Sequence, residues 1–166
     1  LPIQNLIADL TKLPSVGPKT AERYVFYLLR QSPNELQRMA QVIAELKEKT
    51  LICSSCGAVV DQNPCQICSD SKRNPEILCI VANTRDQLNM EATNQFQGYY
   101  LILGGLINTI EGITPTELNF KSLESRIKTG KIKEIILALS PTLEGETTGQ
   151  YIKKLISNTD IKLTRL

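Results

Sequence analysis

Residues 53–68 read Cys53-Ser-Ser-Cys56-Gly-Ala-Val-Val-Asp-Gln-Asn-Pro-Cys65-Gln-Ile-Cys68, which is two Cys-x-x-Cys pairs separated by eight residues. Each pair can chelate one metal ion through a single tight turn, and together the pairs complete a tetrahedral shell of four thiolates. Because the chain contains no histidine, these residues favour a structural zinc site made only of sulfur, which leaves no open position for catalysis. The short spacer predicts a compact zinc knuckle rather than a finger with a recognition helix.

A pair of disulfides, as in a secreted scaffold, is the alternative interpretation of these cysteines. No signal peptide is visible, and the fifth cysteine, Cys79, would be left without a partner. Cys79 lies in the apolar run 77–81, so we expect it to be a small buried hydrophobic residue rather than a reactive thiol. We therefore expect one structural zinc ion per chain and a reducing, cytoplasmic location.

Composition and charge bound the class of protein. The chain has 166 residues, 42% of them hydrophobic, which suffices for one main domain with its own core and a smaller one. No apolar run is long enough to cross a bilayer, so we expect no membrane partner. Residues 1–50 carry seven Lys or Arg and five Asp or Glu, whereas residues 51–166 carry twelve of each. The excess positive charge therefore lies entirely before the knuckle.

Two helices joined by a short turn are predicted at the start of the chain. An apolar stripe at helical spacing predicts a first helix over 3–13, which Pro14 ends. A second helix is expected from Pro18, a residue suited to the first helical turn. Its predicted buried face consists of Ala21, Tyr24, Val25, Leu28 and Leu29. Another face carries three cations: Lys19, Arg23 and Arg30.

This arrangement is the helix-hairpin-helix pattern, whose turn contains Val16 and Gly17. A glycine lets the backbone approach a phosphate, and the free amides at the start of the second helix supply donors with a partial positive charge. Lys19 and Arg23, one helical turn apart, can add charge-assisted hydrogen bonds to the same strand. We therefore predict sequence-independent DNA binding through Val16, Gly17, Lys19 and Arg23. The alternative is a plain helical hairpin with a solvated basic face.

A third helix is predicted from Pro33 onward. Ser32 and Glu35 have the spacing of a capping box around its start. Its apolar stripe consists of Leu36, Met39, Ala40, Ile43 and Leu46. We interpret this stripe as core, with a partner-chain interface as the alternative.

Beyond the polar linker 69–75, apolar segments alternate with amphipathic ones. Strands are expected at 77–82, 99–103, 134–139 and 161–166. Helices are expected at 85–93, 121–129 and 147–157. This alternation predicts a mainly parallel sheet covered on both faces, with any site at the carboxyl ends of the strands.

The order of these parts resembles the RecR family of bacterial recombination mediators. The resemblance rests on the hairpin turn, the four cysteines, a sheet domain like the Toprim fold, and the runs Leu103-Gly-Gly-Leu-Ile107 and Pro141-Thr-Leu-Glu-Gly-Glu146. It implies a nonenzymatic DNA repair protein that acts with RecO, and in some lineages RecF, to load the recombinase RecA onto gapped DNA. It also implies a homo-oligomer, a dimer or a ring-shaped tetramer, in which Lys19 and Arg23 contact DNA. Glu144 and Glu146 match an acidic surface implicated in meeting RecO.

Two features depart from that family pattern. Where the family ends its first sheet strand with a glutamate, which is a Mg²⁺ ligand in catalytic Toprim enzymes, this chain has Ala82. The Asp-x-Asp pair that those enzymes need after a later strand is replaced by the run Ser140-Pro141-Thr142. Mg²⁺ requires carboxylate oxygens, so we expect no phosphodiester chemistry. Family members also continue past the last strand with a glycine-rich turn and a helix, whereas this chain ends at Leu166, so assembly through that tail is not carried over.

The sequence thus predicts an α+β protein of three parts. These are a helix-hairpin-helix region over 1–50, a four-cysteine zinc finger of the knuckle type with its linker over 51–75, and a Toprim-like α/β domain over 76–166. The leading function is a nonenzymatic DNA-binding recombination mediator. The alternatives are a Toprim-type, Mg²⁺-dependent nuclease, primase or topoisomerase fragment, and a zinc-dependent protein adaptor with no role on DNA.

Overall fold

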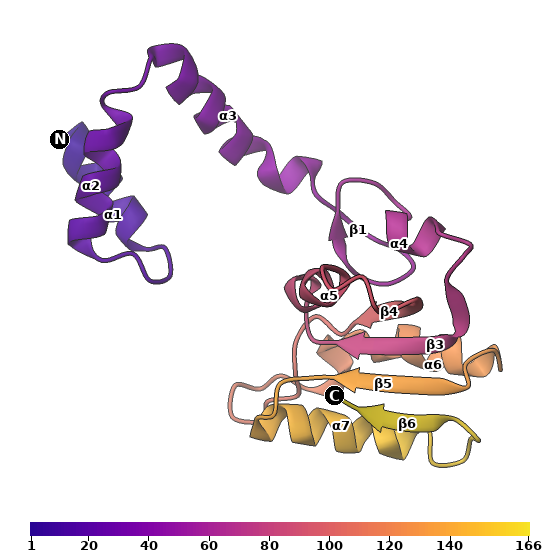
Figure 1. The fold of residues 1–166 in the computed structure, drawn as a ribbon. Coiled ribbons are helices and arrows are strands. Elements are labelled where there is room, and N and C mark those ends of the chain that lie inside the picture. Colours follow the sequence, from indigo (N-terminus) through magenta and orange to yellow (C-terminus); the bar gives the residue numbers. More distant parts are fainter. The chain divides into compact units, whose positions relative to one another are not determined.

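A computed structural model describes residues 1–166, the whole of the chain. They form two compact units, Leu1–Lys49 and Thr50–Leu166 (Figure 1). The first unit is entirely helical. The second contains the cysteine knuckle and an α/β domain built on a parallel sheet. All of the helices are too short or too polar to cross a bilayer.

Three helices make up the first unit: α1 (Pro2–Thr11), α2 (Pro18–Leu28) and α3 (Pro33–Lys49). Each begins with proline, whose missing N–H would have no helical partner in the first turn anyway. α1 packs against α2, on which Ala21 and Val25 are buried. The predicted capping box at the start of α3 is confirmed, because the Ser32 amide donates to Glu35 Oε2 and the Glu35 amide donates to Ser32 Oγ, both at 3.3 Å.

The predicted buried faces of α2 and α3 are wrong in part. On α2, Tyr24 and Leu29 are exposed by 42% and 56%. On α3 no residue is buried, and Met39 and Ile43 are exposed by 48% and 62%. Helical spacing identifies an apolar face but does not say what covers it. A unit this small has too little chain to cover every such face, so the stripe of α3 is not core within the helical unit.

The knuckle, residues 51–69, opens the second unit. Its strands β1 (Leu51–Ile52) and β2 (Val59–Val60) pair antiparallel, and α4 (Gln66–Ser69) is a single helical turn. The sequence analysis predicted a compact knuckle but not these short elements. They are too short to produce a periodic hydrophobic pattern.

Four strands form the main sheet in the order β4-β3-β5-β6, and every neighbouring pair is parallel. The strands are β3 (Asn74–Val81), β4 (Gly98–Ile102), β5 (Glu134–Ala138) and β6 (Lys162–Arg165). The connecting helices are α5 (Thr84–Glu91), α6 (Phe120–Lys128) and α7 (Leu143–Leu155), with a 3₁₀ turn, Pro115–Glu117, before α6. The predicted parallel sheet is confirmed, with strand boundaries displaced by no more than a few residues.

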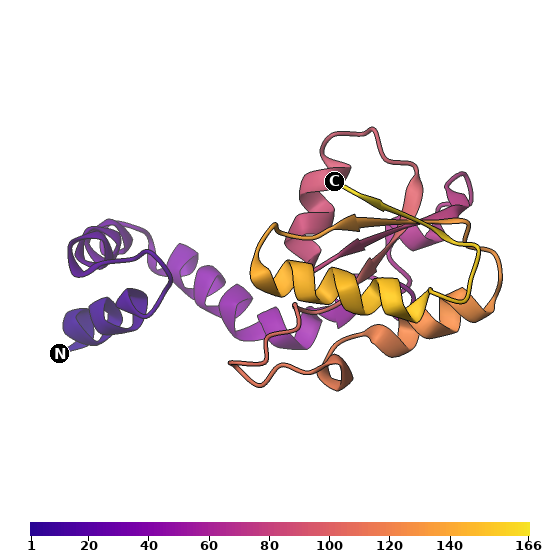
Figure 2. The same cartoon turned by 90° about the horizontal axis from the view of Figure 1, so that it is seen from below.

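The sheet is covered on both faces, as predicted. Alternate residues of β3 point to opposite sides, so Ile80 joins a core cluster with Leu123 of α6 and Ile152 of α7. Its neighbour Val81 joins a second cluster that contains Cys56 of the knuckle. Figures 1 and 2 show α6 and α7 on one face of the sheet and α5 on the other. The second face is therefore covered by the knuckle as well as by a helix.

The start of α7 differs from the prediction. The helix begins at Leu143, four residues before the predicted start at 147. Thr142 caps it, because its side chain accepts a hydrogen bond of 3.2 Å from the Gly145 amide. Glycine weakens the helical pattern in this stretch. As a result, Glu144 and Glu146 lie in the first turn of a helix and not in a loop.

Candidate metal centre and nucleic-acid interface

The four knuckle cysteines come together in one cluster. The Sγ atoms of Cys53, Cys56, Cys65 and Cys68 all lie within 4.8 Å of one another. All five cysteines of the chain are free thiols. The structure therefore shows the four-sulfur arrangement and not the pair of disulfides that the spacing also allowed.

The cluster fits a tetrahedral thiolate site. A zinc ion bound at about 2.3 Å by four sulfurs places each pair of sulfurs about 3.8 Å apart. The Cys56 and Cys65 Sγ atoms lie 3.7 Å apart, which matches that edge. Two amides already donate to sulfur, Cys65 N to Cys53 Sγ and Cys68 N to Cys65 Sγ, each at 3.4 Å. Amide donors of this kind stabilise the thiolate form of a cysteine and fix the orientation of its sulfur for metal binding.

The sulfurs share protons unequally, as closely packed thiols must. A hydrogen bond from Cys56, with smaller contributions from Ser55 and the other cysteines, lowers the pKa of Cys68 to about 5. The same contact with Cys68, together with burial, raises the pKa of Cys56 well above its usual range. Cys68 is thus the thiol poised to be a thiolate near neutral pH. Outside the cluster, Cys79 is fully buried and burial raises its pKa to about 12, which confirms it as an inert core residue.

Hydrogen bonds join the first Cys-x-x-Cys turn to the spacer that precedes the second. The amide and the hydroxyl of Ser54, in the first turn, both donate to Asn63 Oδ1 at 2.9 Å. Gly57 has a φ of +80°, and a Cβ there would lie 2.8 Å from Asn119 Nδ2 and 3.1 Å from the Ile102 carbonyl oxygen. Only glycine tolerates both the positive φ and the close approach of these two atoms. The knuckle can therefore pack closely against the sheet domain at this point.

Backbone and side-chain contacts attach the knuckle to the sheet domain. The Ile102 amide, on edge strand β4, donates to the Cys56 carbonyl at 2.8 Å. Arg126 of α6 donates to the Ser55 carbonyl at 2.6 Å and to Ser55 Oγ at 3.1 Å through one nitrogen, and to the Tyr100 carbonyl at 3.2 Å through another. Arg126 thus joins the sheet to the loop that carries two of the four clustered cysteines.

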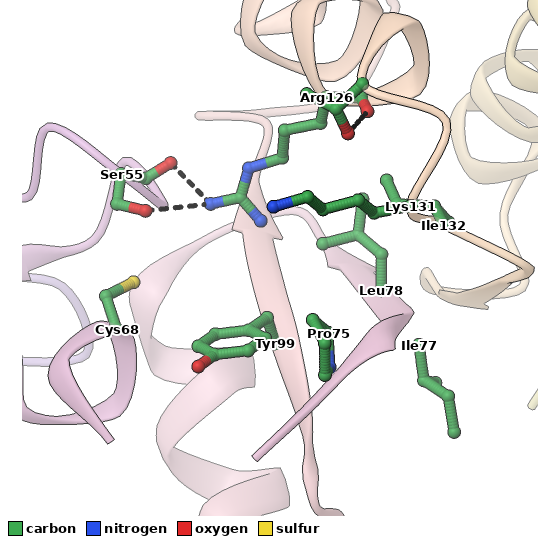
Figure 3. Close-up of a pocket in the computed structure, with 10 residues that line it drawn as sticks. Ser55, Cys68, Pro75, Ile77, Leu78, Tyr99, Arg126, Lys131 and Ile132 are labelled. Carbon is green, nitrogen blue, oxygen red and sulfur yellow. Dashed lines mark hydrogen bonds between the residues drawn. The ribbon is translucent and has the colours of Figure 1, made fainter. Parts of the chain in front are cut away.

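A cavity of about 420 Å³ lies beside this contact (Figure 3). In Figure 3 the Arg126 guanidinium reaches Ser55, and Lys131 and Cys68 line the same cavity. No carboxylate forms an ion pair with Arg126 or Lys131. Sequence reasoning missed Arg126, because a single arginine on an amphipathic helix is indistinguishable from a solvated surface charge.

In the first unit, the predicted DNA-contacting residues lie at the turn before α2 and on its first two turns. Gly17 is the N-cap, with φ −84° and ψ 169°, so its conformation does not require glycine. A Cβ at Gly17 would meet nothing within 4 Å, so the space outside it is open. The Val16 amide is already bonded to the Leu13 carbonyl and is not a free donor.

The start of α2 keeps its donors free. No side chain caps it, and the amides of Gly17, Lys19 and Thr20 have no hydrogen-bond partner in the chain. Lys19 and Arg23 are exposed, and neither forms an ion pair with a carboxylate. Free amides at a helix N-terminus next to unpaired cations make a site suited to an anion.

The carboxyl ends of the sheet strands offer few free polar side chains. Ala82, after β3, is 7% exposed and carries no ligand atom. After β5, Thr142 is engaged as the cap of α7. Glu146 pairs with Arg165 at 2.7 Å. Glu144 accepts hydrogen bonds from its own amide and from Thr142, which lower its pKa. The only group of three or more metal-ligating side chains in the chain is the cysteine cluster.

Comparison with known proteins assigns both units. The family model of the RecR helix-hairpin-helix matches residues 3–47, and that of the Toprim domain matches residues 76–166. Proteins named Recombination protein RecR align over nearly the whole chain. The one from Acidothermus cellulolyticus is 42% identical over 164 residues, which cover 99% of this chain and 82% of the relative. The one from Streptomyces coelicolor is 40% identical over the same shares, and the one from Heliobacterium modesticaldum is 42% identical over 165 residues, covering 99% and 83%. With a helix-hairpin-helix unit, a four-cysteine cluster and a Toprim sheet in this order, the chain belongs to the RecR family of recombination proteins.

Proposed function

We propose that this protein is a nonenzymatic, sequence-independent DNA-binding mediator of recombinational repair. The observation that supports this most directly is the start of α2, with its free amides and two unpaired cations, Lys19 and Arg23. Amides and cations of this kind contact phosphates and carry no base information. The open space outside Gly17 lets a sugar-phosphate strand approach the backbone.

We propose zinc as the ion of the cysteine cluster. Four thiolates in a tetrahedron suit zinc, and the absence of a fifth, open position suits a structural role. The cluster occupies one face of the sheet, where its cysteines pack with Val81, Tyr100 and Ile102. When bound, zinc would supply folding free energy to this region and no chemistry on DNA.

The protein functions, in this proposal, as a homo-oligomer, either a dimer or a tetramer. One hairpin offers only a few phosphate contacts, so a monomer binds DNA weakly, whereas several copies gain avidity. An apolar groove of about 350 Å³ runs between α1, α2 and α3, and half-exposed residues such as Met39 and Ile43 line it. A second copy of the chain is the occupant that would cover this surface.

We propose that the protein acts in the cytoplasm with RecO, and in some lineages RecF. Together these proteins would load the recombinase RecA onto gapped DNA. The acidic first turn of α7 supports a partner surface, because Glu144 and Glu146 both lie there. Glu146 is paired with Arg165, and Glu144 accepts hydrogen bonds from its own amide and from Thr142, so a partner would meet carboxylates that are already held in place. A basic partner surface is the complement that this turn would recognise.

A Toprim-type nuclease is the second candidate, because the Toprim model matches residues 76–166. That chemistry needs carboxylates that hold Mg²⁺. Ala82 stands at the end of β3 and Thr142 caps α7 at the end of β5, so these strand ends lack the required ligands. This geometry favours the nonenzymatic mediator.

The test is DNA binding at two salt concentrations by Lys19→Ala, Arg23→Ala and a matched control. Lys128→Ala removes an exposed charge from the other unit. We expect both hairpin variants to weaken binding several-fold at low salt and to flatten the salt dependence, since each removes about one phosphate contact. The control should leave binding unchanged. Unchanged binding by both hairpin variants would exclude this surface as the DNA site, and Mg²⁺-dependent cleavage by the wild-type protein would favour the nuclease.

A further inference from the structure

We infer that the cavity beside Cys68 (Figure 3) is a binding site for small carboxylates, through which such ligands exchange zinc with the cysteine cluster. The inference rests on the zinc assignment proposed above and concerns the second unit alone. Three observations carry it: the exposure of one cysteine, the two cations that share its cavity, and the hydroxyl that links a cation to the sulfur.

Cys68 is the cysteine of the cluster that solvent reaches. The other three cysteines of the cluster are at most 5% exposed. Cys68 is half-buried and lines the cavity of about 420 Å³. A hollow of about 320 Å³ touches Cys53 from another side, but none of its lining residues is charged. A ligand that exchanges with a cysteine would therefore meet Cys68 first.

Two cations without a carboxylate partner face the same cavity. Arg126 has five N–H donors, and its three hydrogen bonds come from Nη1 and Nη2 only, so its Nε–H stays free. Lys131 is exposed and forms no ion pair. In Figure 3 the Lys131 side chain points toward the Arg126 guanidinium, and no aspartate or glutamate lines the cavity. Two like charges directed into one space favour an anion between them.

Ser55 links the guanidinium to the sulfur. Its hydroxyl accepts a hydrogen bond of 3.1 Å from Arg126. Its hydrogen bond to Cys68 is among the contacts that lower the pKa of this thiol. Figure 3 shows Ser55 and Cys68 on the same side of the cavity, facing Arg126. An anion held by the guanidinium would therefore lie within one side chain of the sulfur.

The walls of the cavity favour an organic carboxylate over inorganic phosphate. Both anions match the cations, but the apolar side chains of Pro75, Leu78 and Ile132 also line the cavity. Apolar walls of this kind stabilise a carbon skeleton. A carboxylate oxygen is itself a zinc ligand in proteins. A small dicarboxylate such as malonate would therefore fit the cavity and keep one carboxylate free to bind zinc.

Neutralisation of the cluster is the alternative role for these cations. Four thiolates around one Zn²⁺ carry a net charge of about −2, which nearby cations stabilise. Loss of a neutralising cation weakens zinc binding and speeds zinc release to any chelator. Loss of a cation from an entry site slows release to anionic chelators alone. The direction of the change therefore separates the two roles.

The test uses Lys131→Gln, because Arg126 also holds the knuckle and its loss would disturb the fold. Lys153→Gln, which removes an exposed charge of α7 outside the cavity, is the matched control. Zinc release from the purified protein is timed with nitrilotriacetate, a carboxylate chelator, and with a neutral pyridyl chelator. We expect Lys131→Gln to slow release to nitrilotriacetate about fivefold and to leave release to the neutral chelator unchanged. The control should match the wild type with both chelators.

Alkylation of Cys68 tests the anion site by a second readout. Iodoacetate and iodoacetamide both form a bond from their methylene carbon to sulfur while iodide leaves, but only iodoacetate is an anion. Mass spectrometry of the peptide that contains Cys68 gives the ratio of the two rates, in which the reactivity of the thiol cancels. We expect this ratio to exceed that of a short cysteine peptide and to fall about fivefold in Lys131→Gln. Malonate should protect Cys68 from iodoacetate, and phosphate at equal ionic strength should protect it less.

The outcomes separate this inference from the zinc assignment. If a zinc-loaded protein shows the same alkylation ratio and the same release to nitrilotriacetate with and without Lys131, the inference fails while the zinc assignment stands. A chain that binds no zinc would overturn the zinc assignment and the exchange role with it. Faster release from Lys131→Gln to both chelators would make Lys131 a neutralising charge and overturn the entry site. Better protection by phosphate than by malonate would overturn the choice of a carboxylate.

Discussion

Replacing Arg126 with alanine would test how the knuckle is attached to the sheet domain. The guanidinium makes three hydrogen bonds, two to Ser55 and one to the Tyr100 carbonyl, all to uncharged oxygens. A hydrogen bond from a charged donor contributes about 1.5–3 kcal/mol when buried, and less at an exposed partner such as Ser55. We therefore expect Arg126→Ala to lower the free energy of unfolding of the second unit by about 2–3 kcal/mol. For a unit of this size the melting temperature should fall by about 10 °C.

Two measurements check this expectation. Thermal unfolding followed by circular dichroism reports stability, and a chromogenic chelator reports the rate of zinc release, which we expect to rise in Arg126→Ala. Arg126→Lys keeps the charge but cannot span Ser55 and the Tyr100 carbonyl with one amine, so it should recover less than half of the loss. Lys128→Ala, an exposed charge two residues away, should lie within about 0.5 kcal/mol of the wild type. An Arg126→Ala protein with wild-type stability and wild-type zinc release would refute the proposed attachment.

Three further predictions concern the second unit. The purified chain should contain one zinc ion per chain, and its removal by a chelator should cost stability in this unit; a folded, metal-free chain by elemental analysis would contradict this. Glu91→Gln should destabilise by about 2–3 kcal/mol in chemical denaturation, because Glu91 accepts hydrogen bonds from Arg73 and from Tyr100 and its loss leaves the largely buried Arg73 guanidinium with only the more distant carboxylate of Asp70, at 3.8 Å; a loss below about 0.5 kcal/mol would show that the network is dispensable. Gly145→Ala should fail to give a stably folded protein or should melt far earlier, since the new Cβ would lie 1.9 Å from the Ser140 carbonyl oxygen; wild-type melting would show that the first turn of α7 can shift.

The features best predicted from the sequence were local ones. The cysteine spacing predicted a four-sulfur cluster because each Cys-x-x-Cys turn brings its own sulfurs together. Apolar runs such as 77–81 predicted buried strands, since their length suits a strand better than a helix and polar residues bound them. The Ser32–Glu35 capping box was predicted for the same reason, because its partners are only three residues apart.

Features that depend on distant partners were not predicted. Helical spacing could not show that the stripe of α3 stays half-exposed, because exposure depends on what other chain is available to cover it. Arg126 gave no local clue, since its partner Ser55 lies far away in the sequence and is reached only when the sheet forms. The helical start at Leu143 was hidden by a glycine whose role is to pass close to Ser140.

The sequence by itself determined the four cysteines that cluster, the turn that exposes free amides, the alternation of strands and helices, and the family. These properties depend on the spacing of residues that are close in the sequence, and that spacing can be read without knowing the tertiary structure. Only the tertiary structure decided which apolar side chains stay in solvent, which carboxylates are already paired, and which face of the sheet the knuckle covers. Those outcomes depend on contacts between residues far apart in the sequence, and these contacts form only when the chain has folded. The burial of each side chain then depends on which other elements pack against it.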